Sequence, residues 1–299
     1  MTNPTEPTDP DIPEEPTHAP SAASDEAGAA PRVMQVEHDG RRPALRVVDA
    51  PAVVLTLAVT LAFLMFLLIE PTPAWIALAG AVVAGAGTDR VLRLARARSV
   101  DLGIDPTPQV LLPALYALAV PVLLEELTRG WWTLLGGLGA GLGFGAILVA
   151  QVHSVRPNER WLAFARPATS AAVYITAFAL FSLTYVFELG LPAALAAVAF
   201  AAGLLAIELL RDGQAELSDT VAFGGVVALL VTQLRWALHY VPLDGYLAAL
   251  ALLLAFFLAS GLLHAHLTLQ LRRTVVAQYV AVAALGGVLI VGARSAGLA

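Results

Sequence analysis

Nine apolar stretches, each about 20 residues long, limit what this chain can fold into. An α-helix rises 1.5 Å per residue, so about 20 apolar residues cross a hydrocarbon core roughly 30 Å thick. Pro, Gly or charged residues bound each stretch, and the stretches are 51–69, 74–90, 109–127, 131–152, 168–187, 193–210, 220–240, 245–267 and 274–293. The sequence therefore predicts an all-α fold, a polytopic bundle of nine transmembrane helices within residues 49–299.

Arginine placement predicts the orientation of this bundle. The chain has 17 basic residues, all of them arginine, and short cytoplasmic loops accumulate such residues. With a cytoplasmic N-terminus, 14 of them fall on the inner side: Arg32, Arg41, Arg42, Arg46, Arg90, Arg93, Arg96, Arg98, Arg156, Arg160, Arg166, Arg211, Arg272 and Arg273. Only Arg129 and Arg294 fall outside, and Arg235 lies within a span. We therefore expect an extracytoplasmic C-terminus and a location in a bacterial inner membrane.

Residues 1–48 differ in character from the rest. Proline recurs every third residue from Pro4 to Pro16, and residues 1–40 hold nine acidic residues against one arginine. With almost no large apolar side chains, this segment cannot offset its ordering entropy by burial. We expect a disordered, acidic, Pro-rich cytoplasmic tail, with docking to a protein partner as the alternative interpretation. The remaining residues carry a balance of only +2, so nucleic-acid binding is not expected, and the main partners are membrane lipids.

Several kinds of chemistry are excluded by residue types that the chain lacks. Without cysteine there is no disulfide, thiolate metal site or cysteine nucleophile, and without lysine there is no Schiff base. His264 and His266 are two positions apart, so on a helix they point about 200° apart and cannot chelate one ion. No metal or cofactor is expected. For Asp89 and Glu208, near the inner boundary, we expect local ion pairs with neighbouring arginines.

The fourth stretch contains six glycines. Gly137, Gly141 and Gly145 repeat at i+4, and this spacing on a membrane helix opens a groove for a neighbouring backbone. A phosphate-binding glycine loop would need a preceding strand. The spacing therefore predicts helix packing, with the fourth helix central in the bundle.

The outer ends of the spans carry the densest set of polar side chains. Arg235 is the most informative of these, because a guanidinium at the centre of a span costs roughly 2.5–3.5 kcal/mol. It lies five residues from the expected end of its helix, so it could snorkel outward or pair with another helix. The other interpretation is an inward-facing anion site. The candidate polar site comprises Arg235, His239, Gln233, Glu125, Glu126 and Glu188.

Glu125 and Glu126 offer a further possibility. Paired glutamates in a membrane helix are similar to those of the CAAX-type intramembrane protease family, which implies water activation helped by histidines on other helices. That family places its arginine one residue further on and has Phe-His motifs on later helices. Here Arg129 is at i+4 and i+3 from the two glutamates, a spacing that favours a local ion pair.

Two stretches resemble an uncharacterised family of bacterial multi-pass membrane proteins, a domain of unknown function. They are Gly87–Arg93 and Gln233–Leu243, and the resemblance would cover most of residues 50–293. It implies location and topology but no activity. We expect first a non-enzymatic scaffold or accessory membrane component. The alternatives are a small-molecule or lipid transporter with a site near Arg235, and an intramembrane enzyme using Glu125, Glu126 and His239.

Overall fold

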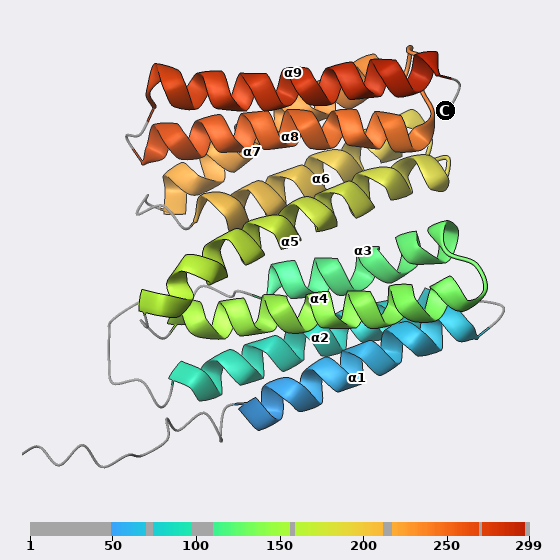
Figure 1. Ribbon diagram of the computed structural model, residues 1–299, viewed down its shortest axis with the longest axis vertical. Helices are drawn as coiled ribbons and strands as arrows, with labels where there is room; N and C mark the ends of the chain where they lie inside the picture. The colour runs from blue at the N-terminus through green and yellow to red at the C-terminus, as the bar shows by residue number, and fades with distance from the viewer. Residues whose placement is uncertain are drawn as a thin grey trace, which may run out of the picture. The chain divides into compact units, whose positions relative to one another are not determined.

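The computed structural model describes residues 49–69, 74–96, 110–155, 159–211, 217–268 and 271–296. Within these ranges the chain forms nine α-helices and no strand, which confirms the all-α prediction (Figure 1). The helices are α1 (Asp49–Leu68), α2 (Ala74–Arg96), α3 (Leu111–Leu127), α4 (Trp131–Val155), α5 (Glu159–Val186), α6 (Leu191–Leu210), α7 (Leu217–Leu238), α8 (Gly245–Leu267) and α9 (Arg273–Ser295). The tail predicted at residues 1–48 lies outside the residues that the structure describes.

Eight of these helices are long and apolar enough to cross a membrane. The exception is α3, which has 17 residues and so stands at the lower end of the range of about 17–25 for a span. Successive helices run in opposite directions (Figure 1). The connections 128–130, 187–190 and 239–244 therefore lie at one end of the bundle, together with the end of α9. We call this the turn end.

Helices α2 and α5 extend furthest beyond their predicted stretches, at the opposite end. We expected the second stretch to end at Arg90, but α2 continues to Arg96 because Val91, Leu92 and Ala95 lie on one face and are buried. Likewise α5 begins at Glu159, before the expected start at 168, and it includes Pro167. A charged residue in the sequence thus indicates where a helix leaves the hydrocarbon core of the membrane, but the helix itself can continue beyond that residue.

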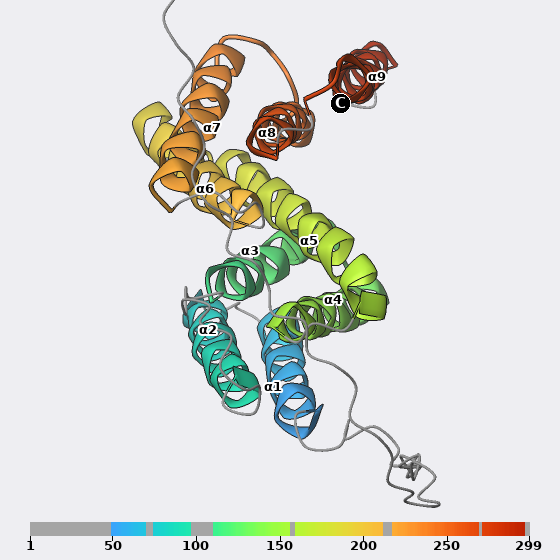
Figure 2. The same cartoon turned by 90° about the vertical axis from the view of Figure 1, so that its left-hand side faces the viewer.

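The helices pack as two groups joined mainly through α5, with a smaller direct contact between α3 and α6. Helices α1, α2, α3 and α4 all contact one another, as do α6, α7 and α8, and α9 contacts only α8. Helix α5 contacts α3 and α4 in the first group and α6 and α8 in the second, and it runs between the groups (Figure 2). We had expected α4 to be central. The structure gives the linking position to α5, because α4 contacts only the first group and α5.

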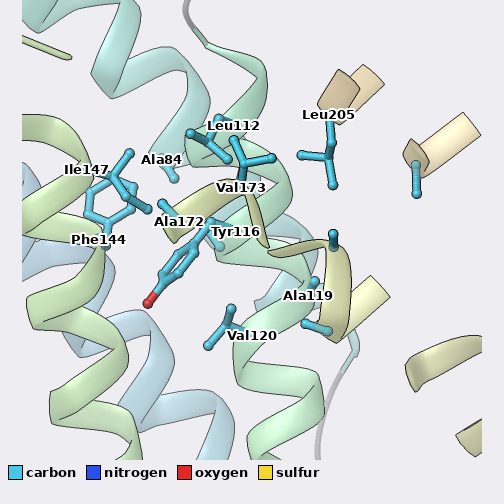
Figure 3. Close-up of a cluster of buried hydrophobic side chains, with 14 of the residues drawn as sticks. Ala84, Leu112, Tyr116, Ala119, Val120, Phe144, Ile147, Ala172, Val173 and Leu205 are labelled. Carbon is cyan, nitrogen blue, oxygen red and sulfur yellow. The ribbon is translucent and has the colours of Figure 1, made fainter. Parts of the chain in front are cut away.

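The buried core surrounds the short helix α3. Apolar side chains of α2, α4, α5 and α6 meet those of α3 there (Figure 3). The Tyr116 hydroxyl donates a hydrogen bond to the Ala140 carbonyl oxygen on α4, at 3.1 Å. In contrast, Ile290 is the one buried residue among those described on α9. Helix α3 is thus the best covered part of the bundle, and α9 is the least covered.

Large aromatic side chains are exposed at the turn end. They are Trp75, Trp131, Trp132, Trp236 and Tyr240, at the turn-end termini of α2, α4 and α7. Trp and Tyr are enriched where a membrane meets water, because one part of each ring system is apolar and the other can bind water. Their position agrees with a membrane boundary at this level.

Candidate functional site

Arg235 points into the bundle. It lies three residues before Leu238, the last residue of α7, and its relative exposure is only 4%. Trp236, the next residue along, is 53% exposed, and Gln233 is also exposed. The sequence left open whether Arg235 snorkels to the membrane surface or faces the interior. The structure places it in the interior, on the face where α7 contacts α6 and α8.

The guanidinium of Arg235 stacks over the ring of Tyr185, near the end of α5. Its central carbon lies 4.1 Å from the ring centroid. The backbones of α5 and α7 make no contact, so this side-chain pair bridges two helices that α6 and α8 separate. A desolvated cation–π contact stabilises a structure by about 2 kcal/mol. The effective penalty for burying an ion is several kcal/mol, so this contact offsets only part of it.

Two of the guanidinium nitrogens, Nε and Nη1, are buried and have no hydrogen-bond partner within the described residues. No acidic side chain in the described part of the chain forms an ion pair with Arg235 either. Buried charges in proteins are normally paired, and each unsatisfied buried donor is unfavourable by about 1–3 kcal/mol. Arg235 is therefore a positive charge that lacks a counter-ion within the described part of the chain.

Two further side chains, both on α5, have a buried hydroxyl group without a hydrogen-bond partner among the described residues. Tyr185 Oη and Ser182 Oγ are both buried and make no hydrogen bond to any described residue. They are one helical turn apart, and Ser182 is fully buried. Neither residue was predicted from the sequence. The signal that could have identified them is a serine and a tyrosine three positions apart in the last turns of an otherwise apolar helix. We call Ser182, Tyr185 and Arg235 the donor cluster.

The start of α8 packs against Tyr185. A Cβ added to Gly245 would lie 2.9 Å from the Tyr185 Cβ, so glycine is what allows this approach. Asp244 caps the helix, accepting a hydrogen bond from the Tyr246 backbone N–H at 3.1 Å. The N-terminus of a helix carries a partial positive charge, but the Asp244 carboxylate at this N-terminus offsets it, so α8 does not add positive charge around Tyr185.

The other predicted site residues do not join the donor cluster. Glu126, Glu188 and His239 are exposed, and Glu125 is half-buried. Glu126 is within electrostatic range of Tyr246. The ring of His239 lies beside Tyr240, with 5.4 Å between centroids.

The enzyme hypothesis required a glutamate of α3 within reach of His239. Among the described residues no ion pair joins Glu125 or Glu126 to His239, which lies in the turn after α7. Arg129 also forms no ion pair with Glu125 or Glu126 in the described chain, contrary to the expected local pair. Helix α3 ends at Leu127, and Thr128 is extended, so Arg129 is no longer on the helical face that the i+3 and i+4 spacing assumes.

The three glycines of α4 face α1. A Cβ at Gly137 would lie 2.8 Å from a Leu64 methyl, and one at Gly145 would lie 2.9 Å from the Thr56 methyl. A Cβ at Gly141 would overlap the side chain of Thr60. Both threonine hydroxyls donate to carbonyl oxygens four residues earlier in α1. The helices thus approach closely without leaving these hydroxyls unsatisfied.

The opposite end of the bundle contains local ion pairs. Arg93 Nε lies 2.7 Å from an Asp89 carboxylate oxygen, and Arg211 Nη2 lies 3.7 Å from Glu208. Both pairs agree with the sequence-based expectation. No group of three or more metal-ligating side chains occurs among the residues that the structure describes.

A family model described as "Protein of unknown function (DUF5656)" matches residues 50–293. This range includes every described helix almost completely, and it includes both stretches on which the resemblance was based. No match was found among curated proteins or among solved structures.

Proposed function

The chain belongs to the DUF5656 family, and because that description assigns no activity, we propose its function from the geometry around Arg235. We propose that this membrane protein binds an anionic small molecule or lipid through Arg235 and transports it. The observation that carries this proposal is the burial of a guanidinium with no acidic partner in the described chain. Ionisable residues that face the interior of a membrane bundle commonly mark substrate pathways.

The burial of Arg235 and its unsatisfied donors favour anion binding over a snorkelling or helix-pairing role. A snorkelling arginine would keep its guanidinium accessible. An arginine that only pairs two helices would have its buried donors satisfied within the protein. Arg235 is almost fully buried and stacks on Tyr185, yet its Nε and Nη1 have no hydrogen-bond partner among the described residues. An anionic ligand would provide the missing counter-ion.

We further propose that the N-terminus is cytoplasmic and that the turn end faces away from the cytoplasm, in a bacterial inner membrane. The arginine distribution supports this orientation. The start of α1 and the end of α9 lie at opposite ends of the bundle, which supports two termini on opposite sides of the membrane (Figure 1). The donor cluster would then be reached from the outer side.

A non-enzymatic scaffold or accessory role is the second candidate. Helix α9 favours it, because this helix contacts only α8 and leaves apolar residues such as Leu285, Val288 and Leu289 exposed. In that case substitution of Arg235 would leave the cellular role unchanged.

The direct test is anion binding by purified protein in a neutral detergent. Thermal unfolding is measured with and without phosphatidylglycerol, phosphate and acetate, for the wild type, Arg235→Met and Arg129→Met. A ligand that binds the folded state raises the unfolding temperature. We expect at least one anion to stabilise the wild type and Arg129→Met, whose substituted arginine is exposed, but not Arg235→Met. Equal stabilisation of all three proteins would refute the proposal.

Uptake then tests transport itself. The anion that binds is loaded into proteoliposomes, and counterflow is followed for the same three proteins. Counterflow by the wild type and Arg129→Met, but not by Arg235→Met, is the expected result. Binding without counterflow would leave Arg235 as a binding site and would refute transport.

A further inference from the structure

We infer that Ser182 and Tyr185 complete the Arg235 site and that its ligand is a singly charged oxyanion, either a phosphodiester or a carboxylate. This inference rests on the proposed function and specifies its substrate class. It starts from the donor cluster, which contains four buried side-chain atoms without partners: Ser182 Oγ, Tyr185 Oη, and Arg235 Nε and Nη1.

All four atoms can donate a hydrogen bond. Arginine has no acceptor, and the serine and tyrosine hydroxyls each offer one donor. A ligand that accepts from all of them must carry several lone pairs and bring few donors of its own. Ionised carboxylates and phosphodiesters are acceptor-only groups, whereas an alcohol, an amide or an ammonium group would bring donors into a site that already has an excess of them.

The stacking of Arg235 on Tyr185 explains why these groups do not satisfy each other. The guanidinium lies over the face of the ring, with 4.1 Å from its central carbon to the centroid, so it contacts the π system and not the hydroxyl. The tyrosine thereby holds the cation in place while its Oη stays free. The ring positions the charge, and the hydroxyl is left to contact a ligand.

The charge of the site sets the charge of the ligand. Among the charged side chains described here, Arg235 is the buried cation of the turn end, and the carboxylates of Glu126 and Glu188 are exposed. Desolvation of a net charge is unfavourable, so a monoanion that neutralises one guanidinium is favoured over a dianion. The start of α8 adds no net positive charge, because the exposed Asp244 carboxylate caps it, and Glu125 at the same end is only half-buried. A phosphodiester in a lipid headgroup and a free carboxylate both meet this requirement.

The experiment separates the hydroxyls from the cation. Tyr185→Phe keeps the ring and the stacking but removes Oη, and Ser182→Ala removes Oγ. Tyr240→Phe is the matched control, because Tyr240 is at the same end and is 70% exposed. Binding is measured in neutral detergent with phosphatidylglycerol, dimethyl phosphate, acetate and inorganic phosphate, and unfolding is measured without added anion.

We expect Tyr185→Phe and Ser182→Ala each to weaken binding of a monoanion by about ten- to a hundredfold, the strength of one hydrogen bond to an ionised group. The same variants should unfold at a higher temperature than the wild type when no anion is present, because an unsatisfied buried hydroxyl is removed. A hydroxyl with a merely structural role would shift the unfolding temperature the other way. Tyr240→Phe should match the wild type in both measurements.

The outcomes distinguish this inference from the proposed function. If Arg235→Met abolishes binding while Tyr185→Phe and Ser182→Ala bind as the wild type does, the inference fails and the proposed function stands. If Arg235→Met binds normally, both fail. Binding of phosphatidylglycerol and dimethyl phosphate assigns the site to a phosphodiester, and binding of acetate assigns it to a carboxylate. Tighter binding of inorganic phosphate than of either monoanion would overturn the charge argument.

Discussion

Replacing Arg235 with methionine should stabilise the protein when no anion is present. Methionine has a similar length, keeps a favourable contact between sulfur and an aromatic ring, and brings neither charge nor donor. The substitution loses the cation–π contact with Tyr185, about 2 kcal/mol. It relieves two unsatisfied donors at about 1–3 kcal/mol each, together with the burial of an unpaired charge. The balance favours the variant by about 1–4 kcal/mol, the range found when buried ionic groups are replaced by apolar ones.

Thermal unfolding in a neutral, delipidated detergent measures this effect. A domain of about 150–250 residues changes its unfolding temperature by about 2–4 °C for each kcal/mol, so we expect a rise of about 5 °C for Arg235→Met. Arg129→Met provides the control, because Arg129 is exposed and its substitution should change stability by less than about 0.5 kcal/mol. Adding the anion that binds should reduce or reverse the difference in unfolding temperature between Arg235→Met and the wild type, because only the wild type gains a counter-ion.

A fall in the unfolding temperature of Arg235→Met would refute the reasoning. It would mean that Arg235 already has a stabilising partner in the folded chain, because removing one member of a buried pair is destabilising by about 3–5 kcal/mol. An anionic ligand would then not be needed as the counter-ion of Arg235.

Three other predictions concern packing and topology. Gly141→Ala should destabilise the protein by about 1–3 kcal/mol, because its Cβ would overlap Thr60. The control Gly139→Ala should be neutral or stabilising, because a Cβ there meets nothing within 4 Å. Equal thermal unfolding midpoints for the two variants would contradict the close approach of α1 and α4. Tyr116→Phe should lower stability by about 1 kcal/mol through loss of the hydrogen bond to Ala140, and an unchanged denaturant midpoint would argue against that bond. Reporter fusions should place the two termini on opposite sides of the membrane, and the detection of both on one side would contradict the odd number of spans.

The helices could be predicted because their cause is local. Apolar runs of membrane-spanning length are visible in the sequence, and so are the Pro and Gly residues at the turns. The errors occurred where tertiary burial extended a helix past a charge, as at Val91 and Leu92 in α2. The missing pair of Arg129 had a similar origin, since helix periodicity was assumed beyond Leu127, where α3 ends.

The candidate site was only partly predictable. Polarity in an apolar helix identified Arg235, but its direction depends on helices that are distant in sequence. Tyr185 contributes the ring that holds the guanidinium, and it comes from α5, which does not touch α7 through its backbone. The predicted acidic partners Glu126 and Glu188 sat at the correct end of the bundle, yet helix rotation and a turn leave them exposed. Glu188, for example, has a positive φ of 47° in the connection before α6.

The attachment of α9 to α8 sets how this helix can shift within the bilayer. Two glycines form the points of attachment: Tyr279 occupies the space where Gly261 lacks a Cβ, and Leu254 lies where Gly286 lacks one. These two contacts specify the register of α9 along α8, since each side chain fits against one glycine. No other described helix contacts α9, so its tilt is the property that we expect to respond to the thickness of the surrounding bilayer.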